Sequence, residues 1–139
     1  MSTAKKSSLE LFRLRKTLNS LANKEGSHTE LITVYVPPGK QISDALNLLR
    51  NEYGTASNIK SNVTRKNVLD AITKAQQKLK LFKDPGEKGI VSFTGALLGE
   101  GDAPGTERME AYVIVPPEAS KIFLYRCDSR FHTEYLQDM

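Results

Sequence analysis

The chain has 139 residues, 39% of them hydrophobic, which fits one domain with a real core. No apolar run approaches the length that a bilayer requires, and the start lacks the features of a secretory signal. We therefore expect a cytoplasmic protein with no membrane contact. The single cysteine cannot form an internal disulfide, and His28 and His132 lie far apart without a cysteine cluster. We expect neither a metal site nor a cofactor.

Charge is distributed unevenly along the chain. Residues 1–83 contain 15 Lys or Arg and 6 Asp or Glu, whereas residues 84–139 contain 5 and 10. A basic half joined to an acidic half indicates a face that binds a polyanion. Solvated helix faces would produce the same pattern, so charge alone leaves both interpretations open.

The first half of the chain shows helical periodicity on both sides of one strand. Leucines at 11, 14, 18 and 21 share one helical face, and "LITVYVPPG" at 31–39 is typical of a central strand that stops at Pro-Pro. A helix is predicted from Ile42 to Tyr53, with Gln41 or Ser43 near its start and Gly54 as its C-terminal cap. A further helix is predicted around 68–79, with an N-cap at Ser61 or Asn62.

The second half predicts strands. The runs "IVSFTGALL", "MEAYVIVPP" and "KIFLYRC" read as three antiparallel strands joined by turn-rich loops. The predicted fold class is α/β, with one mixed four-stranded sheet packed by helices as a two-layer sandwich. Residues 42–79 would form a projecting antiparallel hairpin of helices.

The predicted tip of this hairpin is "GTASNIKS" at 54–61. Asn58 has a donor and an acceptor, as reading a base edge requires, and Lys60 is a donor that suits a carbonyl oxygen; uracil presents two carbonyls. Arg65 and Lys66 follow in the first helical turn, where basic side chains make sense beside an anion such as an RNA phosphate. A capped, solvated loop would also explain the composition. The apolar Ile59 at an exposed tip weighs against that interpretation, unless its side chain packs back on the hairpin instead of contacting a partner.

Two motifs point to a family. "GTASNIKS" resembles the Asn-Ile-Lys-Ser loop of the class I polypeptide release factors of archaea and eukaryotes, and "YRCDSRF" at 125–131 fits their Tyr-x-Cys-x-x-x-Phe motif. The order and separation of the motifs also match. The likeness spans essentially the whole chain but only the N-terminal domain of that family. It implies that residues 1–139 are a single codon-recognition domain, without the middle Gly-Gly-Gln domain and the C-terminal domain.

The resemblance assigns roles residue by residue. In that family this domain recognises stop codons in the ribosomal decoding site. The first uridine is addressed by the tip motif, here Asn58, Ile59, Lys60 and Ser61, supported by Gly54, Thr55, Ala56 and Ser57. The purine side corresponds to Glu52 and to the second motif with Tyr125, Cys127 and Phe131. Thr29 matches the threonine of a Gly-Thr-Ser motif, but His28 and Glu30 replace its neighbours, which leaves open an archaeal-type variant or an altered codon preference.

The same resemblance implies the partners. They are the stop codon of the mRNA, the small-subunit ribosomal RNA and the ribosome, and, for the full-length protein, a translational GTPase and a ribosome-recycling ATPase. No Gly-Gly-Gln tripeptide occurs in the sequence, so this chain is expected to recognise codons and not to act as an enzyme. The alternative is a ribosome-rescue or general RNA-binding module of related fold. A monomer is expected.

Overall fold

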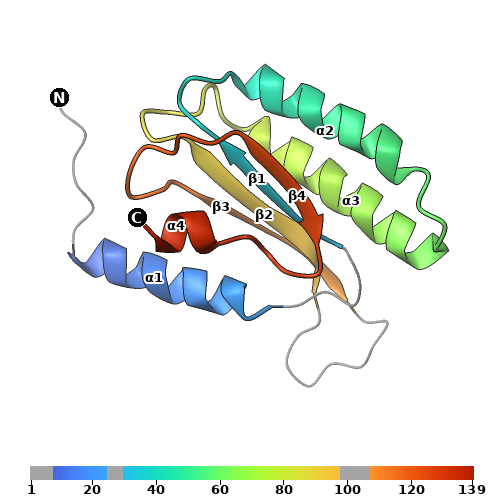
Figure 1. The fold of residues 1–139 in the computed structure, drawn as a ribbon, viewed down its shortest axis with the longest axis horizontal. Coiled ribbons are helices and arrows are strands. Elements are labelled where there is room, and N and C mark those ends of the chain that lie inside the picture. Colours follow the sequence, from blue (N-terminus) through green and yellow to red (C-terminus); the bar gives the residue numbers. More distant parts are fainter. Residues whose placement is uncertain (1–7, 25–29, 98–106) are drawn as a thin grey trace.

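The computed structural model describes residues 8–24, 30–97 and 107–139. The elements, in chain order, are α1 (Ser8–Ala22), β1 (Leu31–Val36), α2 (Ile42–Ala56), α3 (Asn62–Leu79), β2 (Ile90–Leu97), β3 (Arg108–Ile114), β4 (Leu124–Asp128) and α4 (Glu134–Gln137). The strands form one four-stranded sheet in the order β3-β2-β1-β4 (Figure 1). The α/β class, the four strands and the helical hairpin of α2 and α3 are confirmed.

Every pair of neighbouring strands is antiparallel. The predicted mixture of parallel and antiparallel strands is therefore not observed. The helical hairpin explains the direction. Helix α2 carries the chain back along the sheet and α3 returns it to the end where β1 finished, so β2 must run opposite to β1. Gly89 makes this return possible, because it has a φ of +87° and a Cβ there would lie 2.4 Å from the Val36 carbonyl oxygen.

Helices cover both faces of the sheet, which makes three layers where two were predicted (Figure 1). Along β1 the side chains of Ile32 and Val34 pack with α2 and α3, whereas Leu31 and Tyr35 pack with the core on the α1 side. All six residues of β1 are buried. A central strand with both faces covered needs such a continuous apolar run.

The segment after β4 is anchored on the α1 side of the sheet by His132. Its backbone N–H donates to the Thr33 hydroxyl at 3.0 Å, and its carbonyl accepts from the Tyr35 hydroxyl at 2.6 Å. The imidazole lies between the carboxylates of Asp128 and Glu134, at 3.0 and 3.1 Å. These contacts agree with a structural role for His132.

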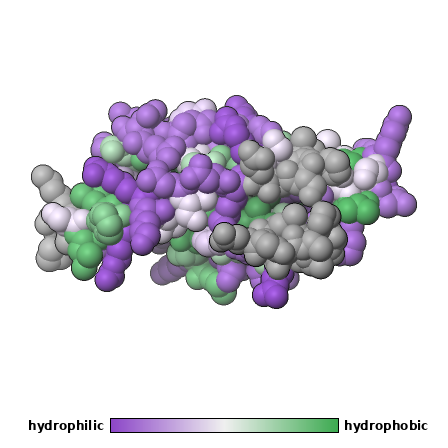
Figure 2. All heavy atoms as spheres, turned by 90° about the horizontal axis from the view of Figure 1, so that it is seen from below, coloured by the Kyte–Doolittle hydropathy of each residue, from purple (hydrophilic) through white to green (hydrophobic). Residues whose placement is uncertain are grey.

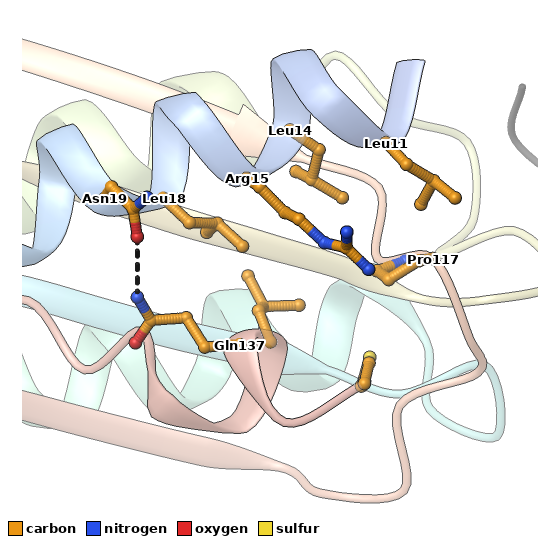
Figure 3. Close-up of a pocket in the computed structure, with 9 residues that line it drawn as sticks. Leu11, Leu14, Arg15, Leu18, Asn19, Pro117 and Gln137 are labelled. Carbon is orange, nitrogen blue, oxygen red and sulfur yellow. Dashed lines mark hydrogen bonds between the residues drawn. The ribbon is translucent and has the colours of Figure 1, made fainter. Parts of the chain in front are cut away.

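The α1 face contains a cavity of about 200 Å³ between α1 and α4. Figure 3 shows leucines of α1 and Pro117 around it, with Asn19 and Gln137 hydrogen-bonded at 3.5 Å. Seen from this side, the surface mixes hydrophilic and hydrophobic residues (Figure 2), and α1 exposes Phe12. No helix in the described part of the chain is long and apolar enough to span a membrane.

Candidate functional site

The hairpin tip is shorter than the sequence predicts. Helix α2 continues through Gly54 to Ala56, so the predicted C-cap at Gly54 is not observed. Ser57 is the C-cap instead, and its backbone N–H and its hydroxyl both donate to the Tyr53 carbonyl, at 3.1 and 3.0 Å, which extends the helix past Gly54. Gly54, Thr55 and Ala56 are therefore helical, and residues 57–61 form the connection.

This connection presents Asn58 and Lys60 to solvent. Helix α3 begins after Ser61, whose hydroxyl accepts from the Thr64 N–H at 3.3 Å, so one of the two predicted N-caps is confirmed. No described residue forms a hydrogen bond or ion pair with the Asn58 carboxamide or the Lys60 ammonium. Both groups are available to a partner.

Arg65 holds the tip in shape. Its guanidinium donates to the Ile59 carbonyl at 2.9 Å and to the Asn62 side-chain oxygen at 2.6 Å. The side chain predicted to contact phosphate thus bonds to the tip's own backbone. Lys66 is exposed and pairs with Asp70 at 2.8 Å, a hydrogen bond that raises the pKa of Lys66. An exposed pair of this kind contributes little stability, so Lys66 can exchange partners.

Replacing Arg65 with alanine should loosen the tip. The amides of Asn58 and Ile59 donate to carbonyls in the last turn of α2, and their hydrogen exchange should become about tenfold faster, since bonds from a charged donor contribute about 1.5–3 kcal/mol. Lys66→Ala is the matched control, because it removes a neighbouring charge without touching the tip. Equal exchange rates in the two variants would show that Arg65 does not hold the tip.

The two sequence motifs meet at one end of the sheet. Strand β4 runs antiparallel to β1 and ends, with Cys127 opposite Ile32, at the end where the hairpin tip lies (Figure 1). A pocket of about 140 Å³ opens between the hairpin and β4. We call it the hairpin pocket, and it is lined by Glu52, Thr55, Ala56, Ile59, Val68, Tyr125 and Cys127. Residues 73 positions apart in sequence, Glu52 and Tyr125, thus line one pocket.

Ile59 connects the tip to this pocket. It is half-buried, packs against the core between the sheet and the hairpin, and lines the pocket together with Tyr125. Of the two explanations for an apolar residue at the tip, packing back on the hairpin is the one observed. Asn58 and Lys60, on either side of Ile59 in the chain, are exposed.

Strand β4 contributes two titratable groups to the pocket, the Tyr125 hydroxyl and the Cys127 thiol, and burial favours the protonated form of both. Burial raises the pKa of the Tyr125 hydroxyl far above its usual value, with further contributions from Cys127 and Glu52. Burial also raises the pKa of the Cys127 thiol to about 11, although its hydrogen bond with Tyr125 opposes the shift and the carboxylates of Asp128, Glu52 and Glu30 add to it. At neutral pH the pocket therefore offers a neutral phenol and thiol beside an acidic side chain.

One predicted site residue lies away from the pocket, and one is not among the described residues. Phe131 is 1% exposed and packs in the core on the α1 side, on the other face of the sheet from the pocket. Thr29 falls outside the described residues. The structure adds Glu30 and Asn67, whose side chains hydrogen-bond at 2.7 Å near Cys127. No local pattern marks this pair, because its members are 37 residues apart. Within the described residues no group of three His, Cys, Asp or Glu could hold a metal ion.

Solved structures with this fold define the class of protein. The chain superimposes on one titled "Crystal structure of archaeal translation termination factor, aRF1" with a TM-score of 0.81 and 34% identity, covering 92% of this chain and 34% of that one. A second, titled "Archaeal protein", gives a TM-score of 0.83 and 34% identity over 92% of this chain and 35% of that one. The domain therefore has the fold of a translation-termination-factor domain.

Sequence comparison identifies the family. The profile described as "eRF1 domain 1" matches residues 9–139, and the chain belongs to this family. It is 51% identical over 132 residues to peptide chain release factor subunit 1 of Methanococcus vannielii, covering 95% of this chain and 31% of the relative. The counterpart from Methanocaldococcus jannaschii is 51% identical over 131 residues, with 94% and 31% covered. The chain thus spans about a third of the length of these relatives.

Proposed function

We propose that this chain is the codon-recognition domain of a peptide chain release factor and reads stop codons in the ribosomal decoding site. Residues 1–139 would form one recognition domain, and release of the peptide would depend on a separate domain. The partners would be the mRNA, small-subunit ribosomal RNA and the ribosome, with a GTPase and a recycling ATPase joining the full-length cytoplasmic protein. The domain itself would bind without catalysing a reaction.

The observation that carries this proposal is the shared position of the two motifs. Ile59 of the tip and Tyr125 and Cys127 of β4 line one pocket, so a short RNA segment can contact the tip and the pocket together. Charge supports the same arrangement. Residues 60–83 contain seven Lys or Arg and one acidic residue, which attracts a phosphate backbone towards α3.

The tip fits the first base of a stop codon. Lys60 donates only, and Asn58 both donates and accepts, so together they complement the two carbonyls and the N–H of uracil. Both side chains are exposed and have no described partner to give up. Single-stranded RNA is commonly recognised in this way, through hydrogen bonds to base edges and stacking.

The hairpin pocket fits the purines that follow. Stop codons present an amino group where adenine occurs and a carbonyl where guanine occurs. The Tyr125 hydroxyl can donate or accept and thus suits both bases, whereas the ionised Glu52 only accepts and favours the adenine amino group. The tyrosine ring can also stack on a base, a contribution of about 1–3 kcal/mol.

The test is peptide release by a full-length release factor that carries this domain, on ribosomes programmed with UAA, UAG, UGA or a sense codon. The proposal expects release at stop codons and none at the sense codon. Release that ignores the codon, or no release at any stop codon by a protein that binds the ribosome, would refute it.

Glu52→Gln should change the balance among stop codons. The amide keeps the shape of the side chain but adds a donor, so it tolerates a guanine carbonyl. We expect release at UGA relative to UAA to rise about tenfold, the equivalent of about 1.4 kcal/mol. Release rates on the three codons measure this directly. A uniform loss, or no change, would count against a purine-reading role for Glu52.

A further inference from the structure

The cavity between α1 and α4 lies on the opposite face of the sheet from the hairpin pocket. Its volume is about 200 Å³, and the leucines of α1 point into it (Figure 3). We call it the α1/α4 cleft, and its apolar lining consists of Leu11, Leu14, Leu18, Pro117, Leu136 and Met139. An apolar cavity of about 150 Å³ is large enough for a benzene ring. The cleft can therefore hold one aromatic or large aliphatic side chain.

The edge of the cleft is polar. Arg15, Asn19 and Gln137 line it and are exposed. The Arg15 guanidinium has no hydrogen-bond or ion-pair partner among the described residues. An apolar centre inside a polar rim is the usual composition of a protein contact surface, whereas separate small ligands usually occupy about 300–1,000 Å³. The cleft thus suits a side chain of a polypeptide better than a separate ligand.

The chain itself leads to this cleft. The Met139 N–H donates to the Leu136 carbonyl at 3.2 Å, and this bond turns the chain after α4 so that Met139 lines the cleft. The two relatives described above are about three times as long as this chain, which covers 31% of each. In a full-length release factor the residues that follow Met139 would therefore start beside the cleft.

Hydrogen bonds fix the segment before α4 relative to the codon site. The His132 N–H donates to the Thr33 hydroxyl, and the His132 carbonyl accepts from the Tyr35 hydroxyl. Thr33 and Tyr35 belong to β1, which pairs with the strand that carries Tyr125 and Cys127. A polypeptide held in the cleft would thus keep a fixed position relative to the hairpin pocket across the sheet.

We propose that the α1/α4 cleft is the docking site for the segment that follows Met139 in the full-length factor, and that this contact positions the release domain relative to the codon site. The segment inserts one large apolar side chain between α1 and α4 and places a carboxylate or carbonyl oxygen beside Arg15. Burial of apolar surface stabilises the contact. The inference rests on the proposed function and goes beyond it by assigning the contact between the domains.

Hydrogen exchange of the α1 amides is the main test. It is measured in the 139-residue chain and in a full-length release factor that carries this domain. The amides of residues 14–21 should exchange about tenfold more slowly in the full-length protein, because the docked segment must leave before α1 can open.

Leu11→Asp should remove this protection, since it places a charge in the apolar lining of the cleft. Leu9→Asp is the matched control. It adds the same charge to the same turn of α1, but Leu9 is 56% exposed and, two residues before Leu11, points from the other side of the helix. The full-length protein should keep its protection in this control.

Asn19→Trp tests the same contact without changing the apolar lining. Asn19 is exposed at the edge of the cleft, so an indole ring at this position can occupy the space from its own helix. The melting temperature of the 139-residue chain should not fall, whereas the protection in the full-length protein should be lost.

Peptide release measures the positioning role. Leu11→Asp and Asn19→Trp should lower release about threefold at UAA, UAG and UGA alike, as expected for a coupling between separate sites. The ratio among the three codons should not change, because the hairpin pocket lies on the other face of the sheet. Leu9→Asp should release normally.

Equal exchange of the α1 amides in the two proteins would overturn the inference, as would unchanged release in a cleft variant that has lost the protection. A mass of the 139-residue chain that doubles with concentration, but not in Leu11→Asp, would show that a second copy covers the cleft and would also overturn it. The proposed function fails separately, when the unmodified full-length protein does not distinguish stop codons from the sense codon.

Discussion

Replacing Lys60 with alanine in a full-length release factor that carries this domain is expected to lower release strongly, and equally, at UAA, UAG and UGA. The three codons share their first uridine, so a residue that reads this base must affect all of them equally. A hydrogen bond from a charged donor contributes about 1.5–3 kcal/mol, which corresponds to a loss of about 10-fold to 100-fold. Release should fall further because the codon would no longer be correctly placed.

The fold should not change in this variant. Lys60 is exposed and bonds to no described residue, so its removal should alter the free energy of unfolding by less than about 0.5 kcal/mol. Lys121→Ala removes the same charge from an exposed residue that precedes β4, at the other end of the sheet from the tip, and should leave release intact. Normal release by Lys60→Ala would contradict the tip assignment, and equal losses in both variants would point to a general effect of charge.

Local sequence patterns predict the hairpin well. The apolar spacing along α2 and α3 places Leu49, Val68 and Ile72 in the core, and Ser61 caps α3 as its position before the periodic run indicates. Gly54 is the exception at the tip. A glycine permits a left-handed cap but does not require one, and Ser57 bonds to the preceding turn and extends the helix.

The arrangement of layers and strands depends on information beyond local patterns. The continuous apolar run of β1 is consistent with cover on both faces, but α1 could have packed elsewhere. Strand direction follows from the pairing of elements, because two helices between β1 and β2 return the chain to its starting end. Neither feature follows from periodicity alone.

The candidate site is only partly visible in the sequence. The motif strings identify Asn58, Lys60, Tyr125 and Cys127, but the register between β1 and β4 is what brings the second pair towards the hairpin. The role of Arg65 depends on the direction in which its side chain points. An arginine in the first helical turn can point outward to phosphate or back to the tip, and only the structure distinguishes these arrangements.

Phe131 shows how a motif residue can lie away from the motif's site. Its backbone follows β4, but its ring packs on the α1 face of the sheet, with its centroid 5.4 Å from that of Phe93 in an edge-to-face contact. We infer that it fixes the end of β4, and so the positions of Tyr125 and Cys127, from the opposite side of the sheet. Phe131, the last residue of the motif, would thus stabilise the fold and would not contact a base.

Phe131→Ala should therefore be strongly destabilising. Removing a buried phenylalanine side chain costs about 3–5 kcal/mol, a large share of the roughly 5–15 kcal/mol that holds a domain folded. The melting temperature should fall by about 10–20 °C. Phe12→Ala is the matched control, because this ring is 64% exposed on α1 and its loss should leave the melting temperature nearly unchanged.

The same variant separates stability from codon reading. At a temperature where Phe131→Ala is still folded, a full-length release factor should keep its balance among the three stop codons, because the ring lies across the sheet from the hairpin pocket. Denaturation curves and release rates on the same preparation provide the comparison. An altered codon balance in a protein of unchanged stability would instead mean that Phe131 takes part in recognition, and that the core contact with Phe93 is not its main role.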